Sequence, residues 1–227
     1  RYPKDMSFTW HNISSTLNKG ALDYLENSVQ IALAVALLGT AAAFLCAYLT
    51  VRLPMRGARF LHLMSITSLA VPGIVLGLAY VMFFKGSFIY GTMSILILVN
   101  TIHFFSSPYL MMYNSLGKLN PNLEAVGATL GVGRLRLIKD VILPQTKATL
   151  LEMFAYFFVN SMMTISAVAF LANAKTKPVS LMINQFEAQT LLEAAAFVSL
   201  PLLLVNLALK GRIFAVKNLL QGRNRRT

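Results

Sequence analysis

Ionisable and thiol side chains are scarce in this chain of 227 residues. Asp, Glu, Lys and Arg make up 12% of it, and it has one cysteine and three histidines. The single cysteine, Cys46, excludes an intrachain disulfide framework. Metal and catalytic sites need clustered His, Cys, Asp or Glu, so we expect neither kind of site. The sequence also lacks a Gly-x-x-x-x-Gly-Lys-Ser/Thr phosphate loop, so we expect no ATP hydrolysis by this chain.

What the sequence does contain is long stretches without charge, and 56% of the residues are hydrophobic. A helix that crosses a hydrocarbon core of about 30 Å needs roughly 20 apolar residues. Such runs cover 27–51, 60–84, 86–117 and 153–174, and a shorter run at 194–209 reaches this length if 188–193 joins it. The runs are apolar at nearly every position, which favours helices over a β-barrel. We predict an all-α integral membrane protein with about five transmembrane helices.

The net charge of +12 is distributed between alternate loops. Most Lys and Arg residues follow the first, third and fifth runs, and only six lie in the other segments. Short cytoplasmic loops carry the Lys and Arg excess, so we predict a bacterial inner-membrane protein with its N-terminus outside and its C-terminus in the cytoplasm. This distribution argues against nucleic-acid binding. The residues assigned to the cytoplasmic side are Arg52, Arg56, Arg59, Lys118, Arg134, Arg136, Lys139, Lys147, Lys210, Arg212, Lys217, Arg223, Arg225 and Arg226.

The first residues, 1–26, are polar with several aromatics, which is typical of a segment at the outer membrane interface. They contain no apolar signal, and the sequence begins at Arg1. We therefore expect a preceding span in a longer polypeptide, with signal-peptide removal as the alternative. The predicted organisation is this outer segment, a transmembrane domain over 27–215 with a cytoplasmic loop at 114–149, and a basic cytoplasmic tail over 216–227.

Two groups of residues within the runs are candidates for lining a translocation path. Pro72 and Gly73 interrupt the second run, and a broken helix often borders the pathway in transporters. A kink used only for packing is the alternative explanation. Asn160, Ser161 and Thr164 carry polar groups in the fourth run, where they must face other helices or a pore rather than lipid.

The loop between the third and fourth runs contains the most informative motif. Residues 123–144 read LEAVGATLGVGRLRLIKDVILP. Apolar residues recur at helical spacing on both sides of Gly131 and Gly133, so we predict a helix, a glycine turn, a second amphipathic helix and a stop at Pro144. Such a helix pair offers apolar surface to a cytoplasmic partner. A helix pair resting on anionic lipid headgroups is the alternative.

This loop resembles the EAA loop of permease subunits of type I ABC importers. That motif reads Glu-Ala-Ala, three residues, Gly, nine residues, Ile, one residue and Leu-Pro. With Gly131 as the anchor, Val141, Leu143 and Pro144 fall in register, and Val141 replaces the isoleucine. The upstream half departs from the motif, because Glu124 lies one residue early. The three upstream positions hold other residues, which are Ala125, Val126 and Gly127.

The resemblance covers roughly residues 27–215 and implies the type I ABC importer permease fold. In that family the loop docks a short coupling helix on an ATPase subunit. The resemblance therefore assigns ATPase coupling to residues of the loop, which are Glu124, Ala125, Gly127, Gly131, Val132, Gly133, Arg134, Val141, Leu143 and Pro144.

The resemblance also implies the partners and the substrate. The partners are a dimer of ATPase subunits that bind ATP and Mg²⁺, an extracytoplasmic substrate-binding protein, a second permease half that is identical or fused, and membrane lipid. The outer segment is most similar to permeases for ferric iron and for phosphonates such as 2-aminoethylphosphonate, which are the expected substrates. Polyamine, sulfate or thiamine transport is the alternative within the family. A channel or secondary carrier is less favoured, because no carboxylate lies in the middle of a run.

Overall fold

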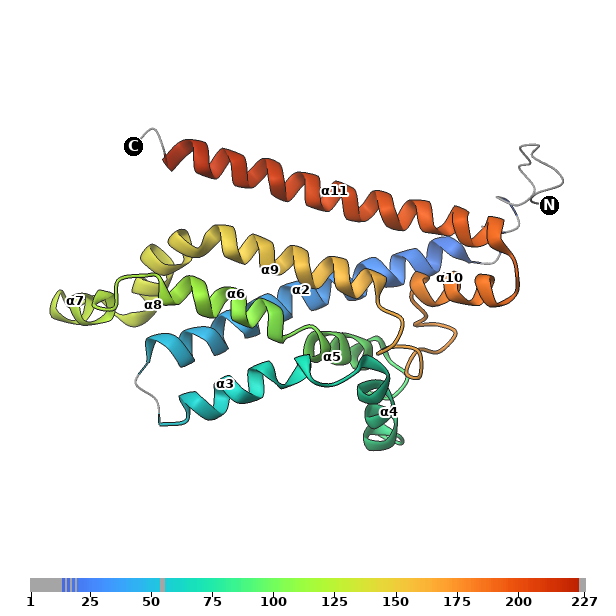
Figure 1. Ribbon diagram of the computed structural model, residues 1–227, viewed down its shortest axis with the longest axis horizontal. Helices are drawn as coiled ribbons and strands as arrows, with labels where there is room; N and C mark the ends of the chain where they lie inside the picture. Colours follow the sequence, from blue (N-terminus) through green and yellow to red (C-terminus); the bar gives the residue numbers. More distant parts are fainter. Residues whose placement is uncertain (1–13, 15, 17, 19, 54–55, 225–227) are drawn as a thin grey trace.

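The computed structural model of the chain describes residues 14, 16, 18, 20–53 and 56–224, and their regular secondary structure is helical. Figure 1 shows an elongated bundle in which α11 runs along one edge. The elements in chain order are α2 (Ala21–Arg52), α3 (Ala58–Ile66), the 3₁₀ helix η1 (Thr67–Leu69), α4 (Gly73–Phe84), α5 (Met93–His103), α6 (Ser106–Gly117), α7 (Leu123–Thr129), α8 (Arg134–Leu137), the π-helical turn η2 (Ile138–Ile142), α9 (Leu143–Met163), α10 (Val179–Ala188) and α11 (Leu192–Asn224).

The contact between α2 and α9 forms the centre of the bundle. On α2, the small residues Ala32, Ala36, Gly39 and Ala43 lie at helical spacing, and all four are buried. Small side chains allow two helices to approach closely. At Gly39 the approach is so close that an added Cβ would lie 2.7 Å from the ring of Phe157 on α9.

The main hydrophobic core extends from this contact to α5 and α6. Leu96 on α5, Tyr109 on α6 and Met153 on α9 are fully buried. A smaller apolar cluster joins the start of α2 to α10 and α11, where Phe186 and Val198 are buried. The two clusters lie toward different ends of α2, so this helix connects the whole bundle.

Two helices in the described part of the chain are long and apolar enough to cross a membrane unaided, Ala21–Arg52 and Leu192–Leu219. Two bent pairs of helices pass the same test of length and composition when each pair is taken as one span. Ala58–Leu69 and Gly73–Phe84 meet at 109°, and Met93–His103 and Ser106–Gly117 meet at 51°. The fifth long helix, α9, has 21 residues and is less apolar because Lys147 and Glu152 lie in its first half. The predicted all-α membrane fold is confirmed, and the two long helices, the two bent pairs and α9 together are roughly consistent with the predicted number of about five spans.

The helices and the charge-free runs have different bounds. In the second run the chain turns sharply at Pro72, the residue before α4. The third run becomes helical only at Met93 and breaks between α5 and α6. The helix that corresponds to the fourth run, α9, covers Leu143–Met163 instead of 153–174. It begins earlier because a helix tolerates charged residues in its first turns, and it ends earlier because the backbone becomes extended at Thr164.

The two ends of the bundle differ in the segments that they contain. The end of α2, the start of α3, α7, α8 and the end of α11 share one end, and the start of α2 and α10 share the other (Figure 1). The basic loops that were assigned to one side of the membrane therefore lie together. Residues 1–13 of the outer segment and 225–227 of the tail lie outside the described residues. The proposed division at 27 and 215 stays a prediction, although α2 already begins at Ala21.

The Gly39→Ala variant is expected to be less stable, because its methyl group would meet the buried ring of Phe157. Overpacking a filled core costs about 1–3 kcal/mol. Thermal unfolding in detergent should therefore show a lower melting temperature. Gly211→Ala is the matched control, because nothing lies within 4 Å of a Cβ there. An unchanged melting temperature for Gly39→Ala would contradict the close packing of α2 on α9.

Candidate functional site

An ion pair joins the end of α2 to the start of α7. Arg52 donates a hydrogen bond from Nε to Glu124 Oε1 at 2.8 Å and another from Nη2 to Oε2 at 2.5 Å. The Arg52 side chain is 4% exposed and that of Glu124 is 18% exposed. Two parallel hydrogen bonds fix the orientation of both groups, and their partial removal from water strengthens the attraction. Glu124 also lies in the first turn of α7, where the helix dipole favours a negative charge.

Arg52 also holds the segment that leads into α7. Its guanidinium donates to the carbonyl of Leu119 at 3.3 Å and to that of Asn120 at 2.8 Å. The side-chain oxygen of Asn120 accepts the N–H of Asn122 at 2.9 Å, which forms a turn before the helix. Sequence analysis missed this role of Arg52, because its partner Glu124 lies 72 residues away and no local pattern connects them.

Gly131 ends α7 with a left-handed turn. Its φ is +72°, a conformation in which a Cβ would add strain. The N–H of Val132 bonds to the carbonyl of Gly127 at 2.8 Å, and the N–H of Gly131 bonds to that of Ala128 at 3.1 Å. This pair of bonds is the Schellman arrangement of a helix C-terminus. The glycine that anchors the EAA-like motif is therefore required by the backbone geometry.

The second half of the loop connects the glycine turn directly to α9. Gly133 precedes α8 in an extended conformation, with φ −64° and ψ 149°. The π-helical turn η2 continues into α9 without a break, and its last residue, Ile142, is fully buried. Pro144 is the second residue of α9 and directly follows the π-helical turn, a place where the usual helical hydrogen-bond ladder is already interrupted. The predicted stop at Pro144 is wrong, because the helical structure continues through this proline. Val141 and Leu143 beside Ile142 are half-buried.

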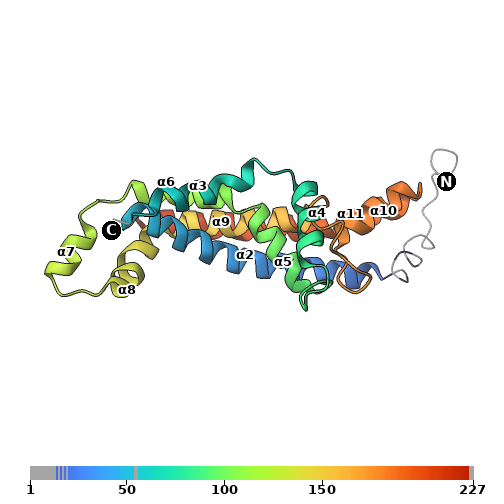
Figure 2. The ribbon, with the colours of Figure 1, turned by 90° about the horizontal axis from the view of Figure 1, so that it is seen from below.

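The tip of the loop exposes apolar side chains. Val126 is 52% exposed, Leu130 is 73% exposed and Leu135 is 84% exposed. Figure 2 shows α7 and α8 protruding beyond the other helices. Arg134 and Arg136 are exposed on the same short helix as Leu135. An exposed apolar patch bordered by charged residues is typical of a docking surface.

The Pro72-Gly73 break lies against the segment that follows α9. At the start of α4, an added Cβ on Gly73 would collide with Ser166 and lie 3.0 Å from Nε2 of His103. The nearest neighbours of Gly73 therefore lie just after the end of α9 and at the end of α5. Ser161 is buried, and its hydroxyl has no hydrogen-bond partner in the part of the chain that the structure describes. The carbonyl of Thr164 accepts a hydrogen bond from α10. The path role of these residues stays a prediction.

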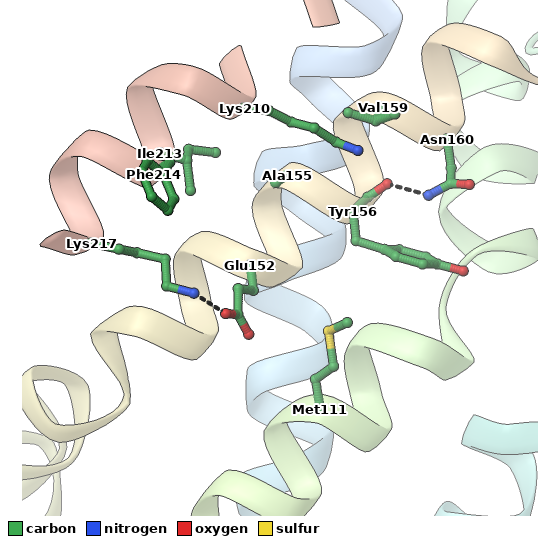
Figure 3. Close-up of a pocket in the computed structure, with 10 residues that line it drawn as sticks. All are labelled: Met111, Glu152, Ala155, Tyr156, Val159, Asn160, Lys210, Ile213, Phe214 and Lys217. Atoms are coloured by element: carbon green, nitrogen blue, oxygen red, sulfur yellow. Dashed lines mark hydrogen bonds and ion pairs between the residues drawn. The ribbon is translucent and has the colours of Figure 1, made fainter. Parts of the chain in front are cut away.

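Asn160 lines a cleft of about 460 Å³ between α6, α9 and α11 (Figure 3). Its amide donates to the carbonyl of Tyr156 at 2.8 Å, and the Tyr156 hydroxyl donates to Ser107 at 3.2 Å. Across the cleft, Lys217 of α11 forms an ion pair with Glu152 of α9. The remaining lining residues are Met111, Ala155, Val159, Lys210, Ile213 and Phe214.

Comparison with protein families decides what kind of protein this is. Residues 36–213 match the family described as the binding-protein-dependent transport system inner membrane component. The chain belongs to this family. The match begins within α2 and ends within α11, so this transport component contains the whole loop and both residues of the Arg52–Glu124 pair. The family expected from the EAA-like loop is confirmed.

Two curated relatives of this permease are ferric transport proteins. It is 30% identical over 163 residues to the ferric transport system permease protein FbpB of Actinobacillus pleuropneumoniae. It is 29% identical over 163 residues to the putative ferric transport system permease protein FbpB 1 of Haemophilus influenzae. Each alignment covers 71% of this chain but only 24% and 26% of the two relatives. The chain thus spans about a quarter of the length of these relatives.

The permease is also similar in fold to a solved transporter. The crystal structure of a bacterial ABC transporter involved in the import of the acidic polysaccharide alginate matches with a TM-score of 0.77. The match covers 96% of this chain and 85% of that chain, at 13% sequence identity. At this identity the likeness concerns the fold alone, and it confirms the predicted ABC importer permease fold.

The Glu124→Gln variant of the permease is expected to loosen α7, because Arg52 would lose its carboxylate partner. Breaking a buried ion pair costs about 3–5 kcal/mol, and the 18% exposure of the Glu124 side chain favours the lower end of that range. Hydrogen–deuterium exchange of the α7 backbone amides should become faster, with little change in α9.

Asp140→Asn is the matched control within the same loop. It removes the Arg136–Asp140 contact of 3.8 Å, in which the side chains are 77% and 56% exposed. Exposed pairs of this kind contribute about 0–1 kcal/mol, so exchange in α7 should stay as it is. Equal exchange rates in Glu124→Gln and Asp140→Asn would contradict the role given to the Arg52–Glu124 pair.

Proposed function

We propose that this permease domain is the membrane-spanning half of an ATP-driven importer, which receives substrate from an extracytoplasmic binding protein. The observation that carries the proposal is the exposed apolar tip formed by Val126, Leu130 and Leu135. In this proposal the tip docks on a dimer of ATPase subunits, which bind ATP and Mg²⁺. A second permease half, identical or fused, completes the path.

The loop has two connections through which movement of the ATPase subunits reaches the membrane. The first is covalent, because η2 continues into α9. The second is the Arg52–Glu124 pair, which ties α7 to α2. Both α2 and α9 belong to the centre of the bundle, so displacement of the tip shifts central helices and changes access to the path.

The proposed orientation puts the tip of the loop in the cytoplasm. Its support is the gathering of the basic loops at the same end of the bundle as α7 and α8 (Figure 1). Because cytoplasmic loops carry the Lys and Arg excess, this end faces the ATPase subunits. The start of α2 and α10 then face the binding protein outside.

Ferric iron is the proposed substrate, and its support is that both relatives are named as permeases of ferric transport systems. The described residues contain no group of three or more His, Cys, Asp or Glu that could hold a metal ion. We therefore assign the selection of iron to the binding protein and its passage to the permease. A phosphonate, the other substrate expected from the sequence, is the competitor in the uptake experiment below.

Cysteines at Leu130 and Leu135 are expected to cross-link to the ATPase subunit, because both side chains are exposed at the tip. The experiment uses a Cys46→Ala background and the assembled complex, treated with a short bifunctional reagent. Gln189→Cys is the control and should not react with the ATPase, because Gln189 is exposed directly after α10, which lies at the opposite end of the bundle (Figure 1). Failure of both tip positions to cross-link would refute the proposed partner.

Proteoliposomes with the permease, its ATPase and the cognate binding protein are expected to accumulate ferric iron only with ATP. Gly131→Pro should abolish uptake, because proline fixes φ at about −65°, whereas φ of Gly131 is +72°. Gly131→Asn should retain uptake, because Asn tolerates the left-handed region. An excess of 2-aminoethylphosphonate should not compete. Robust uptake of a neutral sugar, without competition by iron, would overturn the iron assignment and leave the importer class standing.

A further inference from the structure

The cleft between α6, α9 and α11 holds an ammonium group that the coupling mechanism does not use. Three charged side chains line it, and two of them, Lys217 and Glu152, form an ion pair. The third, Lys210, has neither a hydrogen-bond partner nor an ion-pair partner among the described residues. Figure 3 shows the Lys210 side chain extending along α9 toward Val159 and Asn160. The cleft therefore has a net positive charge, and this charge resides at Lys210.

The lining residues of α11 form one face of that helix. Lys210, Ile213, Phe214 and Lys217 follow the spacing i, i+3, i+4 and i+7, which brings them together on one side. The seven-residue separation of the two lysines corresponds to about 10 Å along the helix axis. Lys210 is the available one, because Glu152 already neutralises Lys217.

The position of Lys210 along α11 indicates which anionic group lies near it. It directly follows the charge-free run 194–209, and from there α11 continues to the basic end of the bundle (Figure 1). A spanning helix meets the lipid headgroups where its apolar stretch ends. Phosphate is the anionic group of lipids at this level, and basic pockets between transmembrane helices bind such headgroups.

We propose that this cleft is a binding site for an oxyanion of the phosphate class, with Lys210 as its principal ligand. The ammonium group of Lys210 binds the oxyanion as a point charge. The organic part of a larger ligand packs on Ile213 and on Phe214, which is 66% exposed. The phosphate group comes either from an anionic lipid or from a free phosphate-class anion. Both sources share the chemistry that the cleft recognises.

The experiment measures binding to the purified full chain with two probes. In the lipid arm, the protein is reconstituted with phosphatidylglycerol in phosphatidylcholine nanodiscs, and native mass spectrometry counts the phosphatidylglycerol molecules retained. In the free-anion arm, titration calorimetry measures the affinity for inorganic phosphate in nanodiscs of phosphatidylcholine alone. Neither readout requires ATP or a binding protein, so a negative result leaves the proposed importer function untouched.

Lys210→Gln is expected to weaken binding about tenfold, the effect of losing one charge-assisted hydrogen bond. Lys210→Arg keeps the charge and should restore binding, which separates loss of the ligand from loss of the fold. Arg212→Gln removes the same charge from the same helix, but at a position that does not line the cleft, and should bind normally.

The pattern across the two arms identifies the source of the anion. A Lys210-dependent loss of phosphatidylglycerol assigns the site to lipid, and a Lys210-dependent loss of phosphate affinity assigns it to a free anion. Both results support the oxyanion site. Equal effects of Lys210→Gln and Arg212→Gln would overturn the site in favour of general attraction to a basic surface. Absence of binding in both arms would overturn it as well.

Discussion

The close packing of α2 against α9 is the constraint on which the rest of the structure depends. It requires Gly39, because any side chain there would occupy the space that the Phe157 ring fills. The C-terminal end of α2, at Arg52, and the N-terminal end of α9, at Leu143, lie in the same part of the molecule. Their packing therefore sets the spacing of the two points that hold the exposed loop. The loop is attached to the central helices of the bundle and not to its periphery.

Many hydroxyl groups in this apolar bundle form hydrogen bonds with backbone carbonyls close to them in the sequence. Hydroxyl groups on several helices donate to the carbonyl four residues earlier, which satisfies these donors without a partner from another helix. The break before α4 follows a different principle, because it is fixed by tertiary packing: an added Cβ on Gly77 would lie 2.7 Å from the carbonyl oxygen of Ala167. The hydroxyls that donate to the carbonyl four residues earlier include those of Thr50, Ser65, Thr67, Thr101, Thr146 and Ser199.

The sequence predicts the features whose signals are local and misses those that join distant segments. The glycine turn at Gly131 can be predicted because positive φ leaves a residue-type signature. The predicted helix bounds fail where hydropathy and helix formation differ, as at Glu152, which lies just before the charge-free run 153–174 but in the middle of α9. The Arg52–Glu124 pair has no local signature. The one-residue offset of Glu124 from the motif does not prevent pairing, since the first turn of α7 still brings its carboxylate to the guanidinium.

The two attachments of the loop differ in kind, and this difference governs what each can transmit. The link to α9 is a continuous helical backbone through η2, so it holds as long as α9 is folded. The link to α2 is the Arg52–Glu124 pair together with the bonds from Arg52 to Leu119 and Asn120. These bonds are non-covalent and can break without unfolding a helix. Force on the loop therefore always reaches α9, and it reaches α2 directly, without passing through α9, only while Arg52 keeps its partners.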